Sequence, residues 1–566
     1  MLLNEIRFNQ VHQVFGLTVV VLVYLVGLPF LFLIYGAFAE SLDNPHFTLR
    51  HIVETFAGWQ FPPLLGRSLV FAAGSALVAI FLGGAAAWFV ERTRSGLGAL
   101  VSITTLLSLT VPGLFSAIAW IVLLSPRVGL VNRWLMDVLG LTAGPFNVYS
   151  MAGMIWVEGV HGAPLAYLLV LPVLGSMDHS FIEAARVTGA NTWKTLRRIT
   201  LPLSFPALLS VFIFRFVRGL ESFDVPAVVG IPNGITVITT EIYALVTVER
   251  NYGAANAFGL GLVLLSLVGI YLYHRVLSKS YRFVTISGKG FHAPKAELSP
   301  AWKIAAAVFL LFYVAVVALL PLAVVTWSAF TPYFMVPSPK AFSKLTLDNF
   351  RSLWENSSVF LAFENTTLVA GASALGAVTL ATATSWLVVR AKIRWSWLLD
   401  LLTFVPLPIP GIMIGVALLW IYLTLPIPVY GTLLILCIGY TTTLLPLAMR
   451  FISPALAQIN VELEEAAQVC GATWWRTLAH VVVPLLLPVF AGAALYVFLL
   501  IFRLVSMAII LYTPATVVVP VLIFDLWGEG TGNAVHALLL VNTVFLFPLA
   551  LCYHWLLRNY RLARTA

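Results

Sequence analysis

Charged residues are scarce in this chain. Asp, Glu, Lys and Arg make up 10% of its 566 residues, whereas hydrophobic residues make up 60%. A water-soluble protein of this size could not bury so much apolar surface, so most of it must face lipid. The net charge of +9 does not indicate a nucleic-acid partner, because the sequence contains no basic soluble domain that would bind one.

The sequence also lacks the motifs of several chemistries. No Gly-x-x-x-x-Gly-Lys-Ser/Thr phosphate loop occurs, so we expect ATP and Mg²⁺ to be bound only by a separate protein. No nucleophile elbow or His/Asp constellation indicates an enzyme. The histidines are scattered, and Cys437, Cys470 and Cys552 show no metal-ligand spacing. We therefore predict no metal site and no cofactor in this chain.

What the sequence does contain is a series of long apolar runs. Each is about 20 residues or longer, the length that crosses roughly 30 Å of hydrocarbon as a helix. We do not count proline and glycine inside a run against helix, because neighbouring helices can satisfy the freed backbone groups. The runs are 16–38, 66–90, 98–124, 151–175, 203–230, 256–276, 303–329, 361–389, 395–424, 430–455, 484–513 and 534–557. The sequence predicts an all-α polytopic membrane protein with about twelve transmembrane helices.

The basic residues predict the orientation of these helices. With the N-terminus inside, the cytoplasmic segments carry 21 of the 32 Lys and Arg residues, the opposite face carries 8 and the spans carry 3. An excess of Lys and Arg marks the cytoplasmic side of a membrane protein. We therefore expect both termini in the cytoplasm.

The chain contains an internal repeat. A motif that begins at residue 183 recurs 282 positions later, and Pro112-Gly113 recurs 298 positions later as Pro410-Gly411. The change of offset places an insertion in an outer loop of the first half, where insertions are tolerated. Each half has six spans, so both enter the membrane in the same orientation, as two parallel six-helix repeats. We predict a first half at 1–276, a cytoplasmic linker at 277–302 and a second half at 303–566.

The best-matched parts of the two halves are two polar loops, 178–202 and 460–484, named here the first and second repeat loops. The first contains Glu-Ala-Ala-Arg-Val-Thr-Gly-Ala and the second Glu-Ala-Ala-Gln-Val-Cys-Gly-Ala, and an apolar residue and proline follow in both. Both loops fall on the cytoplasmic side by the count of spans. A duplicated, water-facing element in a duplicated membrane protein indicates two docking points for a two-fold soluble partner.

The residues of the repeat loops predict a helix–turn–helix in each. Gly189 and Gly471 fit the left-handed position that ends a helix. Ser180 and Glu183 add a possible capping box to the first loop. The matched candidates for helix N-caps are Asp178 and Asn460 for the first helix, and Asn191 and Thr473 for the second.

Loops without a function usually diverge faster than packed spans, so two ordinary loops preserved after duplication are the less favoured interpretation. The Glu-Ala-Ala pattern, with Gly and a downstream apolar-Pro, resembles the signature loop of permease subunits of bacterial ATP-binding-cassette importers of the type I fold. In that family, the short helix sits in a cleft of the ATPase subunit. The resemblance gives the coupling role to Glu183, Ala184, Ala185, Gly189, Glu465, Ala466, Ala467 and Gly471. Gln468 stands where the first loop has Arg186, which makes the two docking faces electrostatically unequal.

The resemblance also implies partners, location and substrate. It implies a transport permease, not an enzyme, in the bacterial inner membrane, with two copies of an ATPase subunit on the cytoplasmic side and an extracytoplasmic substrate-binding protein. Dimerisation of the ATPases on ATP would move the halves between inward-open and outward-open states. A fused double permease with the stretch at 220–226 is similar to the ferric-iron branch, so we expect ferric iron or a chelate. Thiamine and aminophosphonate permeases are alternatives at this level.

Ionisable residues inside spans are costly and usually face a cavity or a partner. The candidates for a polar translocation path are Glu158, Arg215, Arg218, Glu221, Asp224, Arg503 and Ser506. An equally favoured interpretation is a set of salt bridges that fixes helix packing. The acids would suit a cation in passage and the arginines an anion or a chelate, and the sequence does not choose between them.

An ion-coupled secondary transporter is the alternative from another class. It also fits twelve spans, but it predicts buried acids in both halves. It gives no reason for two capped cytoplasmic loops.

Overall fold

The computed structural model describes residues 2–40, 46–109, 111–175, 177, 185, 187–280, 299–391 and 394–565. These residues form helices and turns, with an isolated β-bridge between Ala39 and Phe47. Among the described residues, ten helices are long and apolar enough to cross a membrane, or up to twelve if two bent pairs, Gly98–Ser108 with Gly113–Leu124 and Pro226–Asn233 with Ile238–Thr247, are each one span. Gly411–Thr424 is apolar but shorter than these helices. The all-α polytopic fold is therefore confirmed.

The described residues of the first half form six spans and several shorter helices. The spans are α1 (Leu2–Leu22) continued by η1 (Val23–Gly27) and α2 (Leu28–Phe38), α4 (Phe61–Arg92), the pair α5 (Gly98–Ser108) and α6 (Gly113–Leu124), α8 (Met151–Gly175), α10 (Thr192–Thr195) continued by η2 (Leu196–Thr200) and α11 (Leu201–Leu220), and α13 (Tyr252–Ser280). The short elements are α3 (Arg50–Ala57), α7 (Leu130–Leu139), η3 (Pro226–Gly230), η4 (Ile231–Asn233) and α12 (Ile238–Thr247).

The second half repeats this order. Its spans are α14 (Pro300–Val314) continued by η6 (Ala315–Leu319) and α15 (Leu320–Ala329), α18 (Ser357–Trp386) with η7 (Leu387–Ala391), the pair α19 (Ser396–Phe404) and α20 (Gly411–Thr424), α21 (Leu433–Ala457), α23 (Trp474–Thr477) continued by η8 (Leu478–Val482) and α24 (Val483–Ile501), and α27 (Ala534–Thr565). The shorter helices are α16 (Pro339–Phe342), α17 (Asp348–Glu355), α22 (Val461–Val469), α25 (Ala508–Leu511), η9 (Pro514–Thr516) and α26 (Val519–Gly528).

Four of the predicted runs are not continuous helices over their whole length, while the prediction of about twelve transmembrane helices is confirmed. The run 98–124 is broken into α5 and α6, which are bent by 110° against each other, and the run 395–424 is broken into α19 and α20. Both breaks precede a Pro-Gly pair, and proline removes a backbone donor and disfavours helix in the residue before it. The runs 203–230 and 484–513 end as helix at Leu220 and Ile501, close to the charged residues discussed below.

The π-helical turns support the internal repeat. η1 and η6 lie at matching places in the first span of each half, and η2 and η8 at matching places before the fifth. Such turns are rare and are often found at functional sites. Their recurrence shows that the two halves share local backbone irregularities as well as their order of helices.

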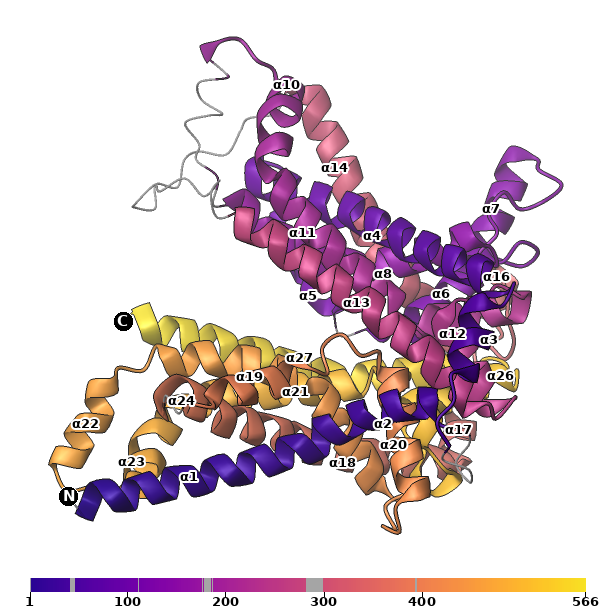
Figure 1. The fold of residues 1–566 in the computed structure, drawn as a ribbon. Helices are drawn as coiled ribbons and strands as arrows, with labels where there is room; N and C mark the ends of the chain where they lie inside the picture. The colour runs from indigo at the N-terminus through magenta and orange to yellow at the C-terminus, as the bar shows by residue number, and fades with distance from the viewer. Residues whose placement is uncertain are drawn as a thin grey trace.

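The first span of each half packs against the other half. α1 contacts α18 and α19, while α14 contacts α4 and α5. Thr105 of α5 and Tyr313 of α14 share a hydrogen bond of 3.0 Å, and Thr442 of α21 donates to the carbonyl of Leu25 over 2.9 Å. The two lobes seen in Figure 1 therefore each combine helices from both halves of the sequence.

Small residues allow the helices of one lobe to approach closely. α4 packs along α8, and a Cβ on Gly159 of α8 would lie 2.5 Å from the side chain of Val78. A Cβ on Gly219 of α11 would lie 3.0 Å from the Cα of Ala72 in α4. A Cβ on Gly83 would lie 2.6 Å from the backbone nitrogen of Tyr167. Small residues at helix interfaces are the usual means of close packing in membranes.

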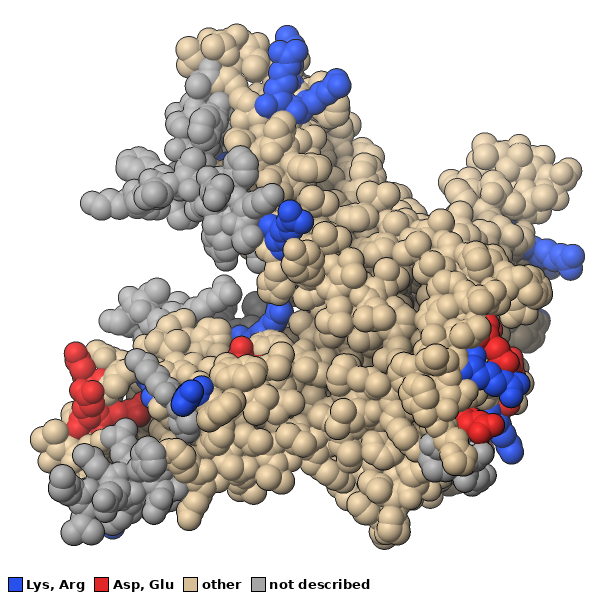
Figure 2. Space-filling view, viewed as in Figure 1, with Lys and Arg blue, Asp and Glu red and all other residues tan. Residues whose placement is uncertain are grey.

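The two lobes diverge toward the end of the molecule that carries the repeat loops. In Figure 1, both chain termini, α10 and α22 lie at this end, while α3, α7, α16 and α17 lie at the opposite end. Figure 2 shows a hollow between the lobes that opens at the α10 and α22 end. The helices meet toward the opposite end, so this conformation is open on one side only.

Candidate functional site

The second repeat loop forms the predicted helix–turn–helix. The Asn460 side chain accepts a hydrogen bond from the backbone amide of Glu462 over 3.1 Å and caps α22, as predicted. Gly471 ends this helix with φ +83°. The amide of Ala472 donates to the carbonyl of Ala467 over 3.0 Å, and the Gly471 amide donates to Gln468 over 2.9 Å. These two backbone hydrogen bonds form the Schellman motif, which a left-handed glycine permits.

The described part of the first repeat loop has the same ending. Gly189 has φ +78°, and the amide of Ala190 donates to the carbonyl of Ala185 over 2.8 Å. Asn191 caps the next helix by accepting from the amide of Lys194 over 2.9 Å, and Thr473 accepts from Arg476 over 3.4 Å in the second loop. Asp178, Ser180, Glu183, Ala184 and Arg186 lie outside the described residues.

Each repeat loop exposes a valine at the same repeat position. Val187 is 89% exposed and Val469 is 88% exposed, although both are large apolar residues. Glu465 and Ala466 are also exposed, whereas Ala467 is half-buried and Ala185 is buried. Exposed apolar residues on a water-facing turn are typical of a surface that another protein covers.

The two loops differ in charge at matched positions. Arg197 and Arg198 are exposed in the first loop, where the second has Ala479 and His480, whereas Lys194 is matched by the exposed Arg476. Glu462 and Glu465 are exposed on α22. In Figure 2, acidic side chains gather over α22. The difference in charge expected from Arg186 and Gln468 is therefore accompanied by one at two exposed positions of the next helix.

Most of the predicted path residues lie together where α11 ends. Arg215 of α11 forms an ion pair of 3.3 Å with Glu158 of α8, and both side chains are buried. Ser222 donates to the second oxygen of Glu158 over 2.9 Å. Arg218 and Glu221 form an ion pair of 2.7 Å, in which the Arg218 side chain is half-exposed and that of Glu221 is buried.

Asp224 and Arg503 connect this group to the second half. Their charges interact with each other and with that of Arg218. The Arg503 guanidinium donates a hydrogen bond to the carbonyl of Leu109, at the break between α5 and α6. This contact joins the two halves. We name the six side chains Glu158, Arg215, Arg218, Glu221, Asp224 and Arg503 the polar cluster.

Ser506 lies at the repeat position of Asp224. A Cβ on Gly411 would lie 2.8 Å from the Ser506 hydroxyl, and a Cβ on Gly113 would overlap the Asp224 carboxylate. The break after the fifth span therefore packs on the Pro-Gly break of the third span in both halves. The backbone approaches closely there, which explains the glycine at each position.

The sequence analysis missed three partners of the polar cluster. His161 was set aside as a scattered histidine, yet its ring is close enough to Arg215 and Arg503 for their charges to act on it. Tyr440 matches Glu158 in the repeat, and Leu504 matches Ser222. The Tyr440 hydroxyl donates to the carbonyl of Leu504 over 2.8 Å, and Tyr440 also interacts electrostatically with Asp224. Gly162 packs directly against the Arg215 guanidinium. The spacing of three residues from Glu158 to His161 was the one signal that could have been used.

The polar cluster contains three carboxylates and three guanidiniums. Glu158 and Arg215 compensate each other's charge within the protein, which fits the packing interpretation, although the buried Nε of Arg215 has no hydrogen-bond partner in the described part of the chain. Arg218 is half-exposed and remains available to a passing group. The role of the cluster in translocation stays a prediction. Among the described residues, no group of three or more His, Cys, Asp or Glu side chains could hold a metal ion.

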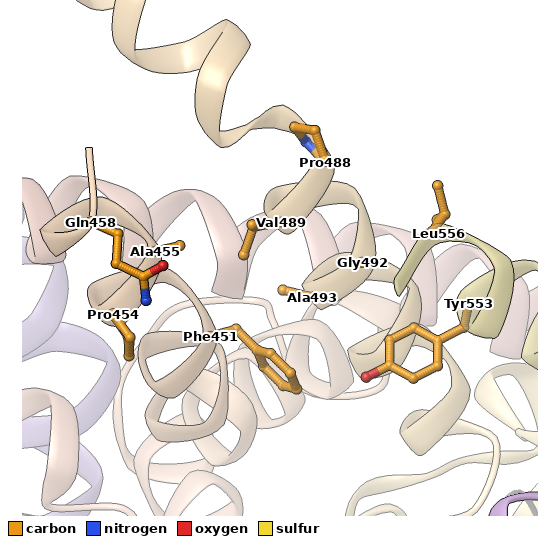
Figure 3. Close-up of a pocket in the computed structure, with 10 residues that line it drawn as sticks. All are labelled: Phe451, Pro454, Ala455, Gln458, Pro488, Val489, Gly492, Ala493, Tyr553 and Leu556. Carbon is orange, nitrogen blue, oxygen red and sulfur yellow. The ribbon is translucent and has the colours of Figure 1, made fainter. Parts of the chain in front are cut away.

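A cavity of about 210 Å³ lies away from the polar cluster, between α21, α24 and α27 (Figure 3). Its lining is mostly apolar and includes Pro454 and Pro488, which lie inside α21 and α24, with Tyr553 opposite. None of the lining residues is charged. The cavity therefore offers no neutralising group to a charged substrate.

A second cavity of about 380 Å³ lies at a contact between the two halves. It is lined by Val122 of α6, by Tyr149 and by Trp527 and His536 of the second half, among other residues. At the equivalent contact in the repeat, a buried tryptophan takes the place of Val122. There Trp420 of α20, at the repeat position of Val122, packs edge-on against the ring of Tyr35 at 6.2 Å.

Comparisons with known proteins match both halves. A family model described as "Binding-protein-dependent transport system inner membrane component" matches residues 61–282 and 372–561. The chain is similar to the ferric transport system permease protein FbpB of Actinobacillus pleuropneumoniae, with 24% identity over 96% of this chain and 79% of that protein. It is also similar to the Fe(3+)-transport system permease protein FbpB 2 of Haemophilus influenzae, with 23% identity over 84% of this chain and 86% of that protein.

Among solved structures, a chain of a bacterial ABC transporter involved in the import of the acidic polysaccharide alginate is similar. The match has 22% identity and a TM-score of 0.40, and it covers 50% of this chain and 99% of that chain.

Proposed function

The chain belongs to the family of binding-protein-dependent transport system inner membrane components, and we propose that it forms the whole membrane pathway of a ferric-iron importer driven by a separate ATPase. The family model matches each half once, which confirms the fused two-half permease of an ATP-binding-cassette importer that the sequence predicts. Relatives of this kind are transport permeases and not enzymes.

The observation that carries the coupling role is the matched geometry of the two repeat loops. Both end in a left-handed glycine, both expose a valine almost completely, and both lie at the end where the lobes diverge. Two ATPase subunits would each cover one loop on the cytoplasmic side, with Glu183 and Glu465 and the alanines that follow them at the contact. A substrate-binding protein would deliver substrate at the opposite end, and both chain termini would then be cytoplasmic.

The hollow between the lobes supports alternating access. It opens on the proposed cytoplasmic side. The halves also touch at the break between α5 and α6, where Arg503 donates to the carbonyl of Leu109. This arrangement corresponds to an inward-open state. Closure of the ATPases on ATP would bring the repeat loops together and open the outer side, where substrate is received.

Ferric iron is supported by the names of the relatives, which match nearly the whole chain. The polar cluster itself has balanced charge and does not select a cation over a chelate. Uptake of radioactive ferric iron by proteoliposomes that contain the complete transporter and its binding protein tests the assignment. Uptake of radioactive 2-aminoethylphosphonate or thiamine, with no uptake of iron, would replace iron with that substrate.

The coupling role is tested by substituting Glu183→Gln and Glu465→Gln together. We expect weaker retention of the ATPase subunit during purification and loss of uptake, because both docking contacts lose a charge. The control is the pair Glu54→Gln and Glu355→Gln, whose exposed carboxylates lie at the opposite end. Full retention and full uptake in the first variant would falsify the assignment.

A further inference from the structure

A single buried arginine joins three segments next to the second repeat loop. Arg390 lies in η7, at the end of the second span of the second half. Its guanidinium donates to the carbonyl of Leu456 over 2.9 Å and to that of Ile459, where α21 ends. Its Nε lies 3.2 Å from Oε1 of Glu464 in α22, and the two side chains are 8% and 9% exposed.

The chemistry of this contact makes it hard to replace. The last carbonyls of a helix have no partner within the helix, and a guanidinium can satisfy several of them at once. Burial of a charge is costly unless an opposite charge compensates it, and Glu464 provides that charge. Removal of one member of a buried pair leaves the other uncompensated. The position of α22 is therefore tied to the ends of α18 and α21.

The first half has only part of this arrangement. Arg92 lies at the repeat position of Arg390 and donates to the carbonyl of Met177 over 3.2 Å. Met177 is the repeat equivalent of Ile459, so the carbonyl contact is common to both halves. The equivalent of Glu464 is Ile182, which has no charge. The sequence of the first half therefore does not permit this ion pair.

We propose that Arg390 is a positioning residue that fixes α22 to the second span through Glu464, so that movement of the second repeat loop is passed directly to α18. The proposal rests on the coupling function proposed above. It predicts that the two loops contribute unequally, because the first half has Ile182 at the position of Glu464. Glu464 itself would not touch the ATPase, since its carboxylate faces inward while Glu465 is exposed.

The test uses the complete transporter in proteoliposomes and measures uptake per ATP hydrolysed, together with retention of the ATPase. Glu464→Ile introduces the residue of the first half, and Glu464→Gln is the variant closest in size. We expect both to retain the ATPase but to lower uptake per ATP about fivefold or more, the lower end for a coupling free energy between sites. Arg390→Lys keeps the positive charge, so we expect it to recover part of the uptake that Arg390→Ala loses. Arg92→Ala is the matched control and should have the smaller effect.

Three results would overturn the proposal. Unchanged uptake per ATP in both Glu464 variants would show that the ion pair transmits nothing. Equal losses in Arg92→Ala and Arg390→Ala would show that only the shared carbonyl contact matters. Loss of ATPase retention in Glu464→Gln would place that carboxylate in the docking face. If Glu465→Gln lowers retention while Glu464→Gln has no effect on coupling, the proposed function stands and only this inference fails.

Discussion

Glu158 and Tyr440 occupy equivalent positions in the two halves, and each bonds to the residue 64 positions further along the chain. Ser222 donates to Glu158 over 2.9 Å, and Tyr440 donates to the carbonyl of Leu504 over 2.8 Å. The contact between the fourth span and the break after the fifth is thus kept in both halves. Its chemistry is ionic in the first half, where Arg215 is the counter-charge, and neutral in the second.

Substitution of the ionic member should destabilise the protein more than substitution of the neutral one. Glu158→Gln leaves the Arg215 guanidinium buried without a counter-charge, which costs about 3–5 kcal/mol. Tyr440→Phe removes one hydrogen bond, worth about 1 kcal/mol. The thermal midpoint of the purified protein in detergent is the measurement. The double variant Glu158→Gln with Arg215→Gln should recover much of the loss, and a further decrease in the double variant would contradict a self-contained pair.

The two Pro-Gly breaks offer a matched pair of substitutions. Gly113→Ala places a Cβ on the Asp224 carboxylate, whereas Gly411→Ala places one 2.8 Å from the Ser506 hydroxyl, which can rotate away. We expect Gly113→Ala to reduce uptake strongly and Gly411→Ala to reduce it little. Uptake by proteoliposomes with equal amounts of each variant distinguishes them. Similar losses would show that both breaks are equally packed.

Trp420 and Val122 occupy equivalent positions at the two contacts between the halves, and exchanging their residue types should change the thermal midpoint to different extents. Trp420 is 1% exposed, and truncation of a buried tryptophan costs about 3–5 kcal/mol. We therefore expect Trp420→Val to lower the thermal midpoint. Val122→Trp should be tolerated, because its larger ring can enter the cavity of about 380 Å³ that Val122 lines. A large decrease for Val122→Trp would show that the cavity is not available.

The contact of Arg503 with the first half predicts a regulatory effect. Arg503→Met removes the hydrogen bond to the carbonyl of Leu109 that joins the halves. With this bond lost, we expect this contact between the halves to open more readily and ATP hydrolysis to rise in the absence of binding protein. The ratio of hydrolysis with and without binding protein measures the effect. An unchanged ratio would show that the hydrogen bond from Arg503 to Leu109 does not hold the two halves together.

The sequence predicted features that depend on local chemistry. The caps at Asn460 and Asn191 and the left-handed Gly189 and Gly471 follow from the preferences of single residues, and the structure confirms them. The breaks at Pro112 and Pro410 were not predicted. Hydropathy does not tell whether a neighbouring helix satisfies the backbone carbonyl groups that a proline leaves without a partner.

Features that depend on tertiary contact could not be predicted. Hydropathy does not say which helices are neighbours, so the exchange of first spans between the lobes was not foreseen. The same holds for the approach of Arg503 to the carbonyl of Leu109, since a backbone acceptor leaves no sequence signal. His161 belongs with this group, because only the fold brings it near Arg503.

The most direct test of the account is cross-linking of the ATPase subunit to each repeat loop. Val187→Cys and Val469→Cys would be made singly after replacement of Cys437, Cys470 and Cys552, with Val248→Cys, 76% exposed at the other end, as the control. The account predicts that a short bifunctional reagent joins the ATPase to both loop variants and not to the control. Cross-linking at neither loop, or at position 248, would contradict it.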